Sequence, residues 1–288
     1  PRRNSGCEAC VSVFVRVRPP KEERESNESR GQNLGRLTFD AGGQHVTQHV
    51  GRKHIKKFTF DRVFGEQSTQ VQVFNHVGRT VVDGALQGFN GSIFAYGQTG
   101  SGKTHTMLGC SEHKRPSGPE DSTSVDEFAG VIPRVLEYLF SELALRDGRT
   151  AAERHGGNET QFSVKVSYLE IYRENILDLL CSDDEEGVNL SLRQDASRGA
   201  YVENLTEINV TSPDEALGVM AKGNSRRKTF STRMNKQSSR SHAVFTVYVE
   251  GLHIDAGTGI RRRRFSRINL VDLAGSERQR STGQQEQD

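Results

Sequence analysis

Apolar side chains recur every three or four residues in three segments, a spacing that places them on one face of an α-helix. The first segment spans residues 68–86 and the second spans 132–143. The third begins at Ser212, where Ser-Pro-Asp-Glu fits a capping box with proline in the first turn, and runs through Met220. We therefore predict three amphipathic helices, the last followed by a polar stretch at 223–240.

Alternation of apolar and polar residues, or a short β-branched run, predicts the strands. The clearest case is a strand that runs to Ile171, in which Phe162, Val164, Val166 and Tyr168 alternate with polar residues. Further strands are predicted at 11–18, 37–39, 57–60, 91–96, 190–192, 207–210, 243–249 and 268–271.

The predicted strands and helices alternate along the chain, which indicates an α/β fold. We expect residues 1–288 to form a single domain with a central, mostly parallel mixed sheet and helices on both faces. A short helix is expected at 176–180 and a basic loop at 261–264. That loop is either an anion-binding patch or a solvated connection between two strands, and the second interpretation is favoured.

A glycine-rich pattern after the predicted strand at 91–96 carries the strongest chemical signal. It fits G-x-x-x-x-G-K-[ST], the phosphate-binding loop of nucleotide triphosphatases, and the segment 103–107 that follows can open a helix. Glycines let backbone N–H groups approach a triphosphate, Lys103 supplies a cation for the β and γ phosphates, and the Thr104 hydroxyl suits Mg²⁺. The predicted phosphate-binding residues are Gly97, Gln98, Thr99, Gly100, Ser101, Gly102, Lys103 and Thr104.

Asp272 follows the last predicted strand, at the strand end where ligands gather in parallel sheets. From there its carboxylate could hold the water shell of Mg²⁺, while the backbone N–H of Gly275 could approach a γ-phosphate. Alone, the pattern D-x-x-G is weak and often marks a turn. After a strand, in a chain with a phosphate loop, it favours a nucleotide site.

The segment 235–242 is rich in hydroxyl groups and ends at a predicted strand. It is either a plain polar loop or a loop that closes on the γ-phosphate, with Ser238 and Ser239 reaching the phosphate and Mg²⁺. In the second interpretation Arg240 pairs with an acid, for which Glu277 is the candidate, and the pair positions the attacking water.

The sequence lacks the motif that specifies guanine in GTPases. The guanine-specifying Asn-Lys-x-Asp pattern is missing, because Asn235-Lys236 is followed by Gln-Ser, and this disfavours the alternative of a GTPase. Arg16, Arg18 and Pro19 offer a flat cationic and ring surface on which a purine can stack.

Composition narrows the range of partners. The 288 residues contain 39 Lys and Arg against 37 Asp and Glu, and a net charge of +2 gives no global bias toward nucleic acid. No apolar run approaches the ~18 residues of a membrane span. The four cysteines form no secreted disulfide pattern, which favours a reducing compartment, and Cys7 and Cys10 lack the second pair that a zinc site requires.

Five blocks of the sequence, in order, resemble the kinesin motor domain. They are Val15–Pro20, Phe94–Met107, Leu169–Tyr172, Asn235–His242 and Asn269–Arg278. Two segments, 130–134 and 234–247, are most similar to the spindle-associated kinesin-twelve subclass.

The resemblance implies a motor that binds and hydrolyses Mg-ATP and moves on microtubules, in the cytoplasm, on the cytoskeleton and, for this subclass, on the spindle. It implies neither a nucleic-acid nor a membrane partner, and dimerisation only through segments outside these 288 residues. Arg193 and Arg198 lie where the family has a microtubule-facing loop.

The resemblance also assigns roles to the candidate site residues. An adenine pocket would be lined by Arg16, Arg18, Pro19 and His105. The first switch would contain Ser238, Ser239 and Arg240, and the second Asp272, Gly275 and Glu277, with the Arg240–Glu277 pair as the gate for hydrolysis. Mg²⁺ would be held by Thr104 and Ser239, and by Asp272 through water.

The resemblance stops near Arg280. A kinesin continues there into a long helix that contacts the microtubule, two further helices, a last strand and the neck linker, whereas here a polar segment, 281–288, follows. We therefore expect a partial motor domain. The alternative is a truncated, non-motor module that binds nucleotide or tubulin.

Overall fold

The structure is a computed structural model that describes residues 11–19, 37–40, 43–50, 54–109, 127–147, 159–182, 187–196, 199–233, 238–254, 258 and 260–277. The Cys7 and Cys10 pair and the polar segment 281–288 lie outside the described residues. The chain folds as two compact units, Pro1–Thr69 and Gln70–Asp288.

The first unit contains two small sheets. β1 (Phe14–Arg16) pairs in parallel with β5 (Arg62–Phe64), and β2 (Leu37–Phe39), β3 (His45–Val50) and β4 (His54–Thr59) form an antiparallel sheet. The prediction at 37–39 is confirmed, and those at 11–18 and 57–60 are confirmed in part. β3 and β5 carry no clear apolar alternation, so pairing with their neighbours decides their conformation.

The second unit is built on a central sheet with strand order β6-β14-β13-β7-β8-β9, in which β12 also pairs with β7. The strands are β6 (Gly91–Ala95), β7 (Glu159–Tyr172), β8 (Asn175–Asp178), β9 (Asn189–Leu190), β12 (Ile208–Val210), β13 (His242–Ile254) and β14 (Arg261–Asp272). A separate hairpin is formed by β10 (Leu192–Asp195) and β11 (Gly199–Val202).

The pairing of this sheet differs from the prediction. β6 and β14 are parallel, and the other pairings of the described strands in this sheet are antiparallel. The mixed sheet of an α/β fold is confirmed, but the expectation of mostly parallel pairing is wrong for the described residues. The short connection between β13 and β14 explains the difference, because a parallel pair would need a long crossover there.

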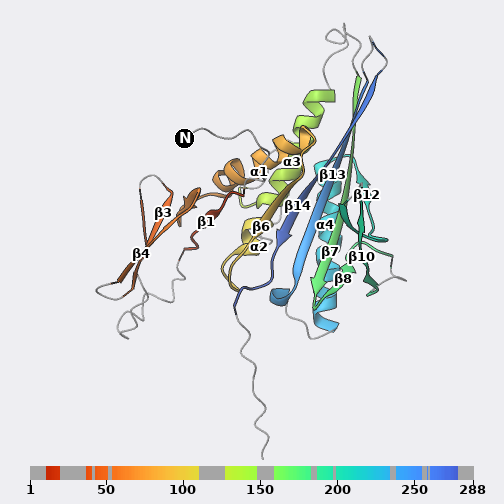
Figure 1. Cartoon of the computed structure of the whole chain (residues 1–288). Helices are drawn as coiled ribbons and strands as arrows, with labels where there is room; N and C mark the ends of the chain where they lie inside the picture. The colour runs from red at the N-terminus through yellow and green to blue at the C-terminus, as the bar shows by residue number, and fades with distance from the viewer. Residues whose placement is uncertain are drawn as a thin grey trace, which may run out of the picture. The chain divides into compact units, whose positions relative to one another are not determined.

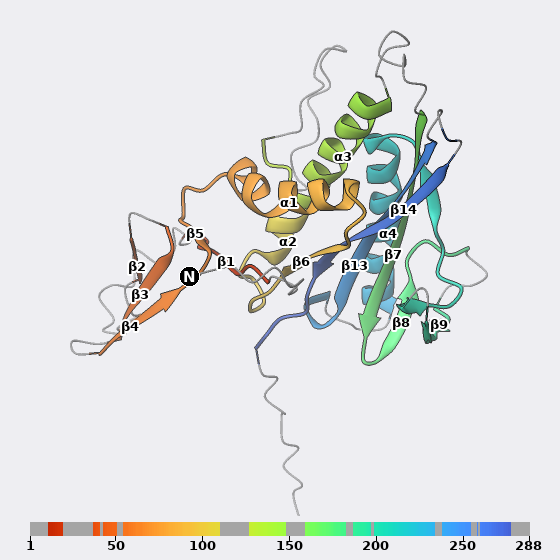
Figure 2. The same ribbon diagram turned by 45° about the horizontal axis from the view of Figure 1, so that its top comes forward.

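The described helices of the second unit are α1 (Gln70–Leu86), α2 (Lys103–Met107), α3 (Val131–Asp147) and α4 (Pro213–Arg233), and a 3₁₀ turn, η3 (Ser238–Arg240), follows α4. Ser266 of β14 donates a hydrogen bond of 2.7 Å to the Ala85 carbonyl in α1, and Tyr168 of β7 donates one of 2.7 Å to Asn224 in α4. The strand register places Ser266 and Tyr168 on one face of the sheet, and α3 packs against both α1 and α4. Figures 1 and 2 show these helices together, so helices on both faces are not found in the described part of the chain.

The core lies between this face of the sheet and the helices. Side chains with at most 1% exposure include Val82, Leu136, Leu139, Val166, Phe245 and Ile268. Leu136, Leu139 and Val166 occupy positions that the periodicities predict, whereas Val82 is buried outside the apolar repeat that predicted α1, a repeat that includes the 40% exposed Val71. Each of the buried side chains contributes roughly 1.5–3 kcal/mol of burial free energy. The predictions of α1, α3 and the central strands are therefore confirmed.

The predicted short helix at 176–180 is wrong, because β8 pairs with β7 as a strand. Arg173 and Glu174 both have positive φ angles, 49° and 65°, as in the two-residue turns that close β-hairpins. Periodicity cannot assign so short an apolar run to helix or strand. The backbone groups that β7 offers for pairing make this segment a strand.

Two polar segments belong to regular elements. α4 continues to Arg233, so the first part of the polar stretch at 223–240 is helical, and the predicted loop at 261–264 is the beginning of β14. Gly223 lies so close to the Tyr168 ring that a Cβ there would overlap it, and Arg261–Arg264 pair with residues 251–254 of β13. The helix therefore extends beyond Met220, where the predicted helix ended, and the predicted loop at 261–264 is wrong, because these tertiary contacts outweigh local polarity.

Candidate functional site

The predicted phosphate loop connects β6 to α2 (Figure 1). Gly97, Gly100 and Gly102 have φ angles of 149°, 77° and 104°, a region in which residues with a Cβ are strained. In β6 Ile93 faces the core, whereas 62% of Phe94 is exposed. The strand–loop–helix order that the motif requires is confirmed.

The ammonium group of Lys103 lies over the loop. Its Nζ donates hydrogen bonds to the carbonyl oxygens of Gly97, at 2.8 Å, and of Gln98, at 3.0 Å. These contacts hold a positive charge inside a ring of backbone that contains the three glycines. Such an arrangement favours an anion with several oxygens, as a polyphosphate has.

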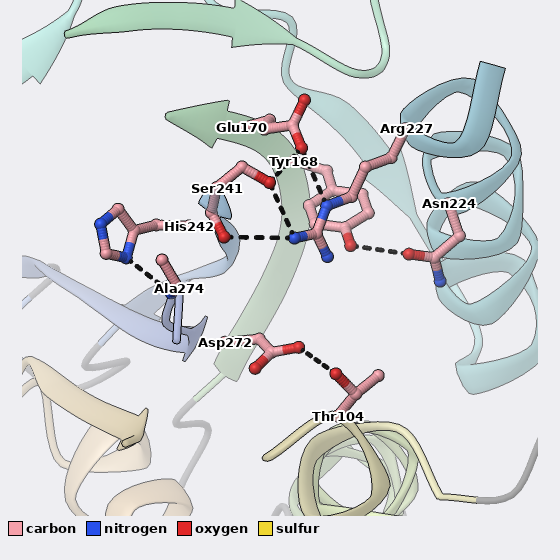
Figure 3. Close-up of polar contacts among 9 residues, drawn as sticks. All are labelled: Thr104, Tyr168, Glu170, Asn224, Arg227, Ser241, His242, Asp272 and Ala274. Atoms are coloured by element: carbon pink, nitrogen blue, oxygen red, sulfur yellow. Dashed lines mark hydrogen bonds and ion pairs between the residues drawn. The ribbon is translucent and has the colours of Figure 1, made fainter. Parts of the chain in front are cut away.

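Asp272 and Thr104 meet beside this loop. The parallel pairing of β14 with β6 places Asp272 opposite Ala95, so both strands end at the same edge of the sheet. Thr104 Oγ1 donates a hydrogen bond of 2.6 Å to Asp272 Oδ2, while the buried Oδ1 has no partner among the described residues (Figure 3). A hydroxyl, a carboxylate and a buried acceptor in need of a donor fit a hydrated magnesium ion.

The segment after Asp272 is bound to the phosphate loop and to η3 by backbone hydrogen bonds. Ser276 N donates to the Gly97 carbonyl at 3.1 Å, and Gly275 N donates to the Ser239 carbonyl at 2.7 Å. Ala274 N donates to His242 Nδ1 at 3.0 Å (Figure 3). The two segments that sequence reasoning assigned to nucleotide sensing are therefore joined directly.

Glu277 contacts the phosphate loop and not Arg240. Its carboxylate accepts hydrogen bonds from Thr99 Oγ1 and, at 2.9 Å, from Thr99 N. The hydroxyl bond is the main cause that lowers the pKa of Glu277 below its ordinary value. The expected Arg240–Glu277 pair is not formed, and the exposed Arg240 side chain makes no ion pair with the described residues. Two donors on Thr99 hold the carboxylate at the phosphate loop instead.

A buried charged cluster lies next to η3, and sequence reasoning assigned it no role (Figure 3). Glu170 of β7 accepts bonds from Arg227 Nε of α4, at 3.0 Å, and from Ser241 Oγ, at 2.5 Å. Arg227 also donates to Ser241 Oγ at 3.1 Å, and 2% of the Glu170 and 12% of the Arg227 side chain is exposed. The signal was an acidic residue within the otherwise apolar end of β7, Tyr168–Tyr172, since a carboxylate is rarely buried without a partner.

Tyr168 borders the same cluster. Burial raises the pKa of its hydroxyl to about 12, and this hydroxyl donates to Asn224 Oδ1 of α4 at 2.7 Å. Tyr168, Arg227 and Asp272 line a small cavity of about 10 Å³ together with apolar side chains. The cluster therefore connects α4, the residues after η3 and the strand that carries Asp272.

Comparison with known proteins identifies the family. The family model described as the kinesin motor domain matches residues 16–288. The chain belongs to the kinesin motor domain family. It is 41% identical over 273 residues to the kinesin-like protein KIN-12C of Arabidopsis thaliana and 43% identical over 272 residues to the kinesin-like protein KIF15 of Strongylocentrotus purpuratus. These alignments cover 95% and 94% of this chain.

A solved structure of a fast kinesin, which has implications for ATPase mechanism and interactions with microtubules, superposes with a TM-score of 0.75. It is 35% identical to this kinesin chain, and the match covers 96% of this chain and 69% of that one. The kinesin fold is thereby confirmed. The chain spans only 12% of the length of KIN-12C and 17% of that of the sea-urchin KIF15.

The expected adenine residues of this kinesin fall in two units. His105, in the second unit, is contacted by Gln70, whose Nε2 donates to the His105 carbonyl at 2.8 Å. Arg16, Arg18 and Pro19 belong to the first unit, and their part in an adenine pocket stays a prediction.

The expected microtubule-facing loop corresponds to the β10–β11 hairpin. Arg193 is exposed and pairs with Glu203 at 2.9 Å, while Arg198 lies outside the described residues. Within the described part of the chain, no helix has both the length and the apolar character needed to cross a membrane.

Proposed function

We propose that this kinesin chain is the catalytic part of a microtubule motor and that it binds and hydrolyses Mg-ATP at the phosphate loop. One observation carries the proposal: Thr104 and Asp272 are hydrogen-bonded at 2.6 Å beside the loop that holds Lys103. A hydroxyl, a carboxylate and a mobile cation around a ring of backbone donors are the groups that nucleotide triphosphatases use.

The phosphate loop, from Gly97 to Thr104 and including Gln98 and Ser101, is proposed to hold the β- and γ-phosphates through its backbone N–H groups and Lys103. Mg²⁺, when bound, neutralises charge that develops on the phosphate oxygens. Its ligands would be the Thr104 and Ser239 hydroxyls, with Asp272 acting through water.

Hydrolysis in this proposal needs a change of partner at Glu277. The carboxylate is bonded to Thr99 and would have to leave it to pair with Arg240. The joined backbone of Gly275 and Ser239 supports such a motion, because movement of one segment displaces the other. Ser238 would then complete the closed site, and the adenine ring would lie against His105 together with Arg16, Arg18 and Pro19.

The proposed partner is the microtubule, and the proposed location is the cytoplasmic cytoskeleton. Family membership supports both, and the similarity to KIN-12C supports placement in the kinesin-twelve subclass. A spindle location is part of the proposal because the sequence resembles that spindle-associated subclass. Dimerisation is proposed to depend on segments outside these 288 residues. Neither nucleic acid nor membrane is proposed as a partner.

Steady-state ATP turnover of the 288-residue chain, with and without polymerised tubulin, tests the proposal. Stimulation by microtubules is expected, together with loss of ATP binding in Lys103→Ala. ATP binding together with ATP turnover that microtubules do not stimulate would instead support a nucleotide-binding module without motor activity. Unchanged ATP binding in Lys103→Ala would contradict the site itself.

A further inference from the structure

The longest run of basic residues in the sequence is Arg261–Arg264, which begins β14. All four side chains are exposed. Because they belong to a strand paired over its whole length with β13, their positions are set by the sheet and not by a loop. The run lies at the end of β14 opposite to Asp272, so the inference is independent of the proposed nucleotide site.

The strand divides the four arginines between two faces of the sheet. Arg262 and Arg264 lie on the same face as Ser266, whose hydroxyl bonds to α1, and they are about 6.6 Å apart along the strand. Arg261 and Arg263 lie on the other face. There Arg263 pairs with Glu250 at 3.3 Å.

A third arginine joins the face that carries Arg262 and Arg264. Arg264 packs beside Gly88, where a Cβ would lie 3.6 Å from it, and Arg146 near the end of α3 donates to the Leu86 carbonyl at 3.4 Å. Both therefore border the turn that follows α1. Figures 1 and 2 show the end of α3 and the beginning of β14 at the same end of the second unit.

Neither Arg262 nor Arg264 forms an ion pair with a carboxylate of the described residues. Like charges so close together repel one another, and at exposed positions they add no core packing. Other strand residues at positions 262 and 264 would therefore stabilise the fold at least as well as the two arginines do. Groups that local stability does not explain are expected where a protein binds something.

We propose that Arg262 and Arg264, together with Arg146, bind an extended acidic peptide segment of a partner protein. Carboxylates at alternate positions of an extended chain have the same spacing as arginines at alternate positions of a strand. Each guanidinium can bind a carboxylate through two parallel hydrogen bonds.

A peptide fits this surface better than a nucleic acid. The aromatic residue of the run, Phe265, lies on the opposite face of the strand, so it offers no stacking platform for bases beside Arg262 and Arg264.

Fluorescence anisotropy with a labelled peptide of ten glutamates tests the proposal on the 288-residue chain. We expect binding that weakens as salt screens the charges, and a loss of about tenfold in affinity in the double variant Arg262→Ser with Arg264→Ser. The matched control is Lys56→Ser with Lys57→Ser, which changes net charge equally at two exposed lysines of β4 and should leave affinity unchanged.

Circular dichroism melting establishes that each variant is folded at the temperature of the assay. Absence of peptide binding by the unaltered chain, or an equal loss in the lysine control, overturns the proposal. So does a larger loss in Arg261→Ser with Arg263→Ser, because those residues lie on the other face. Tighter binding of a ten-nucleotide RNA than of the peptide would assign the surface to nucleic acid instead.

Discussion

Thr104 and Asp272 are 168 positions apart in the chain, and a hydrogen bond of 2.6 Å joins their side chains. The bond exists because β6 and β14 are parallel neighbours that end at the same edge of the sheet. One residue follows the phosphate loop and the other follows the strand beside it, so the pair brings two distant motifs to one point.

If this pair holds the magnesium ion, Thr104→Val should weaken binding of Mg-ATP by roughly 10- to 100-fold, because the variant removes an oxygen ligand and leaves Asp272 without its donor. Thr104→Ser, which keeps the hydroxyl, is the matched control and should bind nearly as well as the unaltered chain. Calorimetric titration with Mg-ATP, and with ATP in excess EDTA, measures the difference. An equal loss in EDTA would show that the hydroxyl does not act through the metal.

The contact of Glu277 with Thr99 should depend on pH in a defined direction. Because hydrogen bonds from Thr99 lower the pKa of Glu277, the contact is fully present above the ordinary carboxyl range. It should be lost only as pH falls through the lowered value. The chemical shift of the Thr99 amide, followed by NMR during acid titration, reports this transition.

Thr99→Val should move that transition toward higher pH, since the variant removes the hydroxyl donor and keeps the backbone donor. Glu277→Gln should abolish it, which provides the control for assigning the titrating group. A transition at the same pH in Thr99→Val would mean that the hydroxyl bond does not hold the carboxylate.

The Glu170–Arg227 pair should be essential for stability because both charges are buried. Glu170→Gln leaves Arg227 buried without its counter-charge and should lower the free energy of unfolding by about 3–5 kcal/mol. The double variant with Arg227→Met should lose clearly less than the sum of the single variants. Urea denaturation of the four proteins measures the coupling, and simple additivity would rule out a direct interaction.

Tyr168 should remain neutral far into the alkaline range. Its pKa of about 12 exceeds the ordinary value of 10.0, so the stability it confers is complete below pH 10 and is lost as pH rises toward 12. The loss amounts to about 2–3 kcal/mol. An alkaline titration followed by tyrosinate absorbance, while the chain remains folded, should show a step at the highest pH for Tyr168. This step should be missing in Tyr168→Phe. Persistence of that step would assign it to another of the six tyrosines.

The sequence by itself determined the parts of the site that depend on local backbone. Positive φ angles were predictable at Gly97, Gly100 and Gly102, because glycine adopts them without strain. The position of Asp272 after an apolar run likewise indicates the end of a strand. Helix α1 and helix α3 were also predictable as helices, because apolar residues that recur at three- and four-residue spacing indicate a helix with one side packed on the core. These features can be predicted without knowing which residues contact them in the folded chain.

Tertiary structure alone decided the features that depend on partners distant in the chain. Polarity in α4 and at the beginning of β14 favoured loops, yet packing on Tyr168 and pairing with β13 impose a helix and a strand. The partner of Glu277 was likewise undetermined, because any nearby donor satisfies a carboxylate and proximity belongs to the fold. Glu170 shows the same limit, since its charge is stable in the core only where α4 brings Arg227 to it.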